Sequence, residues 1–120
     1  MIAACGKDNV GLVIDFWHLH AGGNTRPEEV AQMDANLIYG IHYCDGRAAR
    51  AGEARDERVQ RNYEPGQGEV DIHGWLNAVR ATGYDGVWTP EWLSPHAWEK
   101  DLFETGQASM QSLKQYGITV

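Results

Sequence analysis

VGLVIDFWHLH, residues 10–20, is the stretch that decides the fold. An almost unbroken apolar run, Val10–Ile14, ends abruptly in Asp15, and His18 follows three residues later. Such a run is typical of a strand that is covered on both faces, as in the parallel sheets of α/β proteins. In these sheets the carboxyl ends of the strands carry the ligand and metal sites. The sequence therefore predicts a buried strand that presents Asp15 and His18 at a functional edge.

Two later stretches repeat this arrangement. LIYGIHYCD, residues 37–45, carries His42 near its end, and YDGVWTPEW, residues 84–92, carries Glu91. Carboxylate oxygens and imidazole nitrogens are common ligands of divalent cations. We therefore expect Asp15, His42 and Glu91 to act together as metal ligands.

Length and charge restrict the class of protein. A chain of 120 residues forms one domain at most and is long enough to bury a core. Its net charge of −7 gives no broad attraction to nucleic acid or to anionic membranes. The basic cluster from Arg47 to Arg61 is interrupted by Glu53, Asp56 and Glu57, which favours a solvated loop over a nucleic-acid patch.

The two cysteines, Cys5 and Cys44, form no C-x-x-C pair, and the N-terminus lacks the apolar core of a signal peptide. No apolar run is long enough to span a membrane. These features favour a cytoplasmic protein. Cys44 lies beside the candidate site, where a small buried filler is a better expectation than a soft ligand or a nucleophile.

The rest of the chain predicts three strand and helix units in one domain over residues 1–120. A Gly-rich loop is expected at residues 21–24, and a loop with a brief helical turn at residues 45–69. Capping residues predict helices over residues 27–33, 71–82 and 95–116. In the last helix the expected core residues are Trp98, Leu102, Met110 and Leu113.

Four motifs in this order, VIDFWH, IHYCD, PGQGEVD and GYDGVWTPEW, resemble the C-terminal part of the xylose isomerase-like TIM barrels, the sugar phosphate isomerase/epimerase superfamily. The resemblance covers nearly the whole chain. It implies a partial (β/α)8 barrel made of the last three strand and helix units, whereas a complete barrel has about 250 residues. The N-terminal strands would be absent.

The resemblance also implies a divalent metal, Mn²⁺, Mg²⁺, Co²⁺ or Zn²⁺, held by a Glu, an Asp, a His and a second Glu on successive strands. Asp15, His42 and Glu91 match the last three ligands, and the first Glu would precede Met1. In the epimerases of this superfamily the two metal-bound glutamates also act as acid and base. Glu91 would then be one half of a catalytic pair.

Further site residues follow from the same resemblance. The D-x-x-H motif places His18 as a catalytic or substrate-binding residue, or alternatively as a hydrogen-bond partner of a ligand. An Arg ahead of the P-G-x-G turn binds substrate in the family, and it corresponds best to Arg61, with Arg47 as a second candidate.

The leading functional hypothesis is a metal-dependent sugar or sugar phosphate isomerase or epimerase. It would transfer a proton next to a carbonyl through a metal-stabilised enediolate of a small sugar or polyol. A dehydratase of a cyclic polyol ketone, such as an inosose or dehydroshikimate, is the alternative on the same scaffold.

A non-enzymatic alternative is an inactive half-barrel, which would pair with another copy or with a separate N-terminal half. An apurinic endonuclease is disfavoured by the net charge and because Asp71 and His73 follow the Gly-rich turn instead of preceding it. The sequence leaves the substrate, the metal and the oligomeric state open.

Overall fold

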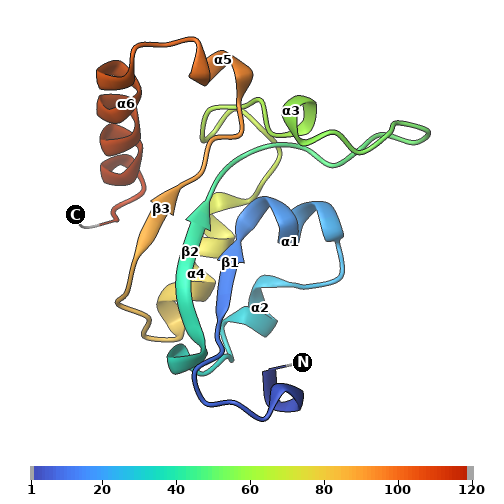
Figure 1. The fold of residues 1–120 in the computed structure, drawn as a ribbon, viewed down its shortest axis with the longest axis vertical. Coiled ribbons are helices and arrows are strands. Elements are labelled where there is room, and N and C mark those ends of the chain that lie inside the picture. Colours follow the sequence, from blue (N-terminus) through green and yellow to red (C-terminus); the bar gives the residue numbers. More distant parts are fainter. Residues whose placement is uncertain (1, 119–120) are drawn as a thin grey trace.

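Three parallel strands form one sheet, in the order β1-β2-β3, in the computed structural model, which describes residues 2–118 (Figure 1). The strands are β1 (Leu12–Asp15), β2 (Ile38–Tyr43) and β3 (Trp88–Pro90). Asp15 is the register partner of His42, and Tyr43 is the partner of Pro90. The carboxyl ends of all three strands therefore meet at one edge of the sheet, which confirms the predicted α/β architecture.

Short helices connect and follow the strands. Two 3₁₀ segments are η1 (Ile2–Cys5) and η2 (Ala35–Leu37), and the α-helices are α1 (Phe16–Gly22), α2 (Pro27–Val30), α3 (Glu57–Gln60), α4 (Ile72–Ala81), α5 (Pro95–Trp98) and α6 (Leu102–Gln115). Helix α4 lies behind the sheet in Figure 1 and packs against α2. Helix α6 stands to one side, beyond β3.

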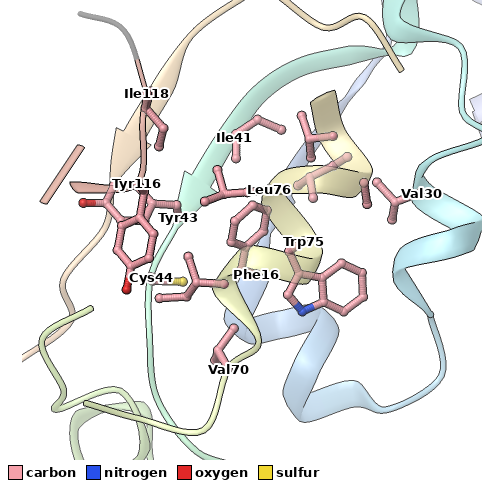
Figure 2. Packing of buried hydrophobic residues seen from close by; sticks show 14 of the residues in the cluster. Phe16, Val30, Ile41, Tyr43, Cys44, Val70, Trp75, Leu76, Tyr116 and Ile118 are labelled. Atoms are coloured by element: carbon pink, nitrogen blue, oxygen red, sulfur yellow. The ribbon is translucent and has the colours of Figure 1, made fainter. Parts of the chain in front are cut away.

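The core lies between the sheet and its helices (Figure 2). Phe16 is fully buried and stacks on Trp75 with ring centroids 6.4 Å apart. The Tyr43 hydroxyl donates a 2.6 Å hydrogen bond to Ser112, which ties β2 to α6. The sequence predicted that other parts of the chain cover both faces of β1, but Val13 is 56% exposed. Within residues 2–118, one face of this strand is thus open.

Helix α1 was not predicted. The sequence indicated a loop over residues 21–24, whereas the helix continues to Gly22 and ends at Gly23, whose φ is 65°. The Asp15 carboxylate begins the helix by accepting a hydrogen bond from the His18 backbone N–H at 2.9 Å. Burial of Phe16 and Trp17 then stabilises it despite their modest helix propensity.

The prediction of one long helix over residues 95–116 is wrong, because the chain forms two helices there, α5 and α6. Asp101 begins α6 by accepting hydrogen bonds from the backbone N–H groups of Phe103 and Glu104. The prediction that this segment supplies four core residues is also wrong for three of them. The exposed fractions are 58% for Trp98, 86% for Leu102 and 42% for Met110, while Leu113 is buried at 4%.

No helix among residues 2–118 has the length and apolar character that a membrane crossing would require.

Candidate metal centre

The three predicted ligands meet at the carboxyl edge of the sheet. Asp15 ends β1, His42 lies near the end of β2, and Glu91 directly follows β3. Their ligand atoms all lie within 4.8 Å of one another. His42 Nδ1 is 3.2 Å from a Glu91 carboxylate oxygen and 4.0 Å from Asp15 Oδ2. Parallel pairing of the strands thus brings residues up to 76 positions apart into one cluster.

The donor set of this cluster fits a divalent cation. Two carboxylates and one imidazole suit Zn²⁺, Mn²⁺ or Co²⁺, whose bonds to such ligands are about 2.0–2.2 Å long. The ligand atoms, which lie within 4.8 Å of one another, would therefore need to move only slightly toward a common centre to bind one ion. Asp15 is buried, whereas Glu91 and His42 are about one third exposed, so the cluster is open to ligands from one side.

Asp15 is held in place by groups that favour its ionised form. Burial raises the pKa of this carboxyl, but the His18 backbone N–H and the Arg61 guanidinium lower it, and the net pKa lies below the usual value of 3.8. Its Oδ1 accepts the His18 N–H and the Cys44 thiol, the latter at 3.3 Å. Oδ2 faces Arg61 and the other two ligands, and is the oxygen left for a cation.

Arg61 supplies positive charge to the cluster. Its side chain is only 1% exposed, and Nη2 lies 3.0 Å from Asp15 Oδ2 and 2.6 Å from Glu91 Oε2. Its Nη1 donates to Glu57 at 3.2 Å, while its Nε has no hydrogen-bond partner among residues 2–118. Arg61 thus bridges two of the three candidate ligands.

The structure separates the two arginine candidates. Arg61 reaches the cluster, whereas the Arg47 guanidinium forms a two-pronged ion pair with Glu53, at 2.6 and 2.7 Å. The Arg47 carbonyl accepts a hydrogen bond from Trp17 Nε1. His18 lies one helical turn after Asp15, with an exposed side chain directed at Arg55.

Asp45 ends the LIYGIHYCD stretch, and the structure gives it a role that we did not predict. Its buried carboxylate accepts four backbone N–H groups, from Gly46, Gly66, Gly68 and Val70, at 2.7–3.1 Å. These bonds fasten the loop of residues 45–69 onto the end of β2. The Gly-rich turn that follows Pro65 is the signal that such an anchor exists.

Cys44 is the buried filler that the sequence favoured. It is 1% exposed, and burial together with the negative charge of Asp15 raises the pKa of its thiol far above 9. The thiol donates to Asp15 and therefore does not act as a thiolate at neutral pH.

Comparison with known proteins identifies the family of this chain. The sequence model of the xylose isomerase-like TIM barrel matches residues 1–115. The chain belongs to the xylose isomerase-like TIM barrel family. Among the curated relatives of this chain, the inosose isomerase of Bacillus velezensis is 35% identical over 106 residues, which is 88% of this chain and 36% of that protein. The inosose isomerase of Bacillus subtilis is 31% identical over 121 residues, covering 100% of this chain and 40% of the relative.

Solved structures agree with the family assignment. The crystal structure of the IolI protein with a bound zinc atom has a TM-score of 0.81 and 29% identity, over 96% of this chain and 40% of that one. A xylose isomerase domain protein from Alicyclobacillus acidocaldarius subsp. acidocaldarius has a TM-score of 0.67 at 21% identity, which shows the shared fold alone. The chain thus spans about two fifths of the length of these xylose isomerase-like proteins.

A shorter match is to a probable endonuclease 4 of Buchnera aphidicola, which is 32% identical over 69 residues, 53% of this chain and 25% of that protein. It covers a smaller part of the chain than the inosose isomerases do.

Proposed function

We propose that this chain is the C-terminal part of a metal-dependent isomerase that acts on a small sugar or polyol ketone. The observation that carries the proposal is the convergence of Asp15, His42 and Glu91 within 4.8 Å at the carboxyl edge of the sheet. The zinc atom in the related IolI structure and the inosose isomerases among the relatives support it.

Each residue has a distinct role in this proposal. Asp15, His42 and Glu91 would hold the metal, together with a glutamate from a preceding strand of a complete barrel. A divalent cation bound there would stabilise negative charge that develops on the substrate oxygens. Glu91 is the proton acceptor, since its side chain is 31% exposed and can reach a carbon bound next to the cluster.

Arg61 and His18 complete the proposed site. Arg61 holds the carboxylates of Asp15 and Glu91 in place. A substrate oxygen bound beside these carboxylates would accept a hydrogen bond from its guanidinium. His18 has an exposed side chain beside the cluster, where it would contact a substrate oxygen.

Isomerisation and dehydration of a cyclic polyol ketone begin with the same proton abstraction, so this site serves either reaction. The name of the relatives favours isomerisation of an inosose. An endonuclease is less well supported, because its match is shorter and the net charge is −7. A location in the cytoplasm stays a prediction from the sequence.

Exchange of substrate hydrogen with solvent tests the proposed proton transfer. We expect the chain with Mn²⁺ to catalyse deuterium incorporation from D₂O next to the carbonyl of an inosose, measured by proton NMR. Glu91→Gln should lower the exchange rate at least 100-fold, because it removes the base. Arg58→Gln, an exposed change on the loop of residues 45–69, should leave the rate unchanged. If the unchanged chain bound Mn²⁺ but did not exchange the inosose hydrogen with solvent, the proposed proton transfer by this chain would be contradicted.

A further inference from the structure

Five arginines lie on the loop of residues 45–69, and four of them are paired with carboxylates. The pairs are Arg47 with Glu53, Arg50 with Glu69, Arg58 with Asp56, and Arg61 with Asp15, Glu57 and Glu91. Within the described part of the chain, no carboxylate lies within ion-pair distance of the fifth, Arg55. Its guanidinium charge is therefore available to an anion from outside.

Arg55 is nevertheless held in a defined position. Its guanidinium carbon lies 4.9 Å from the centroid of the Trp17 ring, and Nη2 lies 3.3 Å from His18 Nδ1. An arginine can only donate hydrogen bonds, so in this contact His18 Nδ1 is the acceptor, and Nε2 is the ring nitrogen left to donate. Arg55 and His18 thus present N–H donors side by side.

The Trp17 ring connects this pair with the metal cluster. The ring is fully buried, and its Nε1 donates a 2.9 Å hydrogen bond to the Arg47 carbonyl. The guanidinium carbon of Arg61 lies 5.1 Å from the centroid of the same ring. The guanidinium carbons of Arg55 and Arg61 are therefore no farther apart than these two centroid distances together. His18 follows Asp15 by three residues, and its backbone N–H donates to the Asp15 carboxylate at 2.9 Å, so the pair of Arg55 and His18 lies next to the cluster.

We propose that Arg55 and His18 form a subsite for the anionic group, a phosphate or a carboxylate, of a sugar or polyol whose reacting end lies at the Asp15, His42 and Glu91 cluster. This inference rests on the proposed function and adds sugars or polyols with an anionic group to the substrates that the site can take. A planar guanidinium donates two parallel hydrogen bonds to such an oxyanion, and His18 Nε2 adds a third donor. The anion would bind at this point although the chain as a whole is acidic.

Equilibrium binding of three sugars to the Mn²⁺-loaded chain tests the subsite. The probes are fructose 6-phosphate, glucuronate and neutral fructose, with dissociation constants measured by calorimetry at 0.1 M salt. We expect at least one of the two anions to bind at least tenfold more tightly than fructose, and the stronger of them identifies the anionic group. Arg55→Gln should abolish this preference, and the matched variant Arg58→Gln should retain it, because Arg58 is already paired with Asp56.

Equal binding of all three sugars, or a preference that survives in Arg55→Gln, would overturn the subsite. Mn²⁺ binding and circular dichroism of Arg55→Gln should equal those of the unchanged chain, which excludes misfolding as the cause of a lost preference. If the chain failed to bind Mn²⁺ but kept an Arg55-dependent preference for an anion, the proposed function would fail and the subsite would stand.

Discussion

Arg61 is a buried cation between two carboxylates, one of which is itself buried. Its ion pairs with Asp15 and Glu91 compensate the cost of removing these charges from water. In the absence of a metal, this guanidinium is the group that keeps the two acidic ligands close together.

Removing this cation should destabilise the metal-free chain. We expect Arg61→Gln to lower the free energy of unfolding by about 3 kcal/mol, the cost of breaking a buried ion pair. A divalent metal should restore part of this loss, so the rise in Tm on adding Zn²⁺ should be larger in the variant. Urea unfolding and thermal melts measure both effects, with Arg58→Gln as the exposed control. Equal stability of Arg61→Gln and the unchanged chain without metal would contradict this role.

Glu53 gives the loop of residues 45–69 a dependence on pH. Hydrogen bonds from the Arg47 guanidinium and the Arg50 backbone N–H lower the pKa of Glu53 from 4.5 to about 2. Because the pKa is lower in the folded state, this stabilisation is complete above about pH 4.5 and is lost as the pH falls through 2.

A carbon NMR titration of the Glu53 carboxyl should therefore show a midpoint near 2 in the folded chain. Arg47→Gln should move this midpoint toward 4.5, because it removes the principal hydrogen-bond donor. High salt should have a smaller effect, since the hydrogen bonds persist. A midpoint near 4.5 in the unchanged chain would mean that the pair with Arg47 does not form in solution.

At the scale of elements, the loop of residues 45–69 is held by backbone contacts to Asp45. Gly68 permits these contacts, because a Cβ atom there would overlap the Asp45 carboxylate and lie 2.6 Å from the backbone N and O of Gly46. Backbone atoms of Gly46 cannot move aside as the end of a flexible side chain can.

Gly68→Ala should therefore lower the free energy of unfolding by about 2 kcal/mol. It should also accelerate hydrogen exchange of the Gly66 and Val70 amides. Gly22→Ala is the matched control, since a Cβ atom at the end of α1 meets nothing within 4 Å and alanine is the better helix former. Equal effects of the two substitutions would show that the contacts around Asp45 do not hold the loop.

The elements also show what the sequence can predict and what it cannot. The strand ends were predictable, because an apolar run that stops at Asp15, His42 or Glu91 identifies both the strand and its functional edge. Helix α1 was not, because its first residues are aromatic and its capping residue is also a candidate ligand. The division between α5 and α6 was missed because Asp101 acts as a cap within an otherwise helical pattern.

Contacts between distant segments were the least predictable part of the site. The approach of Arg61 to two ligands and the stacking of Arg55 on Trp17 depend on the path of the loop of residues 45–69. This loop has no periodicity from which a path follows. The resemblance to a family favoured Arg61 over Arg47, but it gave no indication of Arg55 or of the Asp45 anchor.

At the scale of the whole molecule, an apolar surface lies along α5 and the exposed side of α6. Trp98, Leu102 and Phe103 are 58%, 86% and 72% exposed. Together with Met110, two of these side chains line a shallow groove on α6. Contiguous exposed apolar side chains promote association of protein chains.

The isolated chain should therefore associate at high concentration. We expect the double variant Leu102→Ser with Phe103→Ser to have a lower mean mass in light scattering at about 0.5 mM than the unchanged chain. Its circular dichroism should be unchanged, because neither side chain is buried. Val59→Ser, at another exposed apolar residue, is the control. An unchanged chain that is monomeric at this concentration would contradict the expectation.

A calorimetric titration of the chain with Zn²⁺ tests the metal centre directly. It is repeated with Asp15→Asn, His42→Gln and the control His96→Gln, whose side chain is exposed and outside the cluster. We expect one Zn²⁺ per chain, at least 100-fold weaker binding in the first two variants, and unchanged binding in the control. Absence of binding, or binding that survives in Asp15→Asn and His42→Gln, would contradict the assignment of the metal centre.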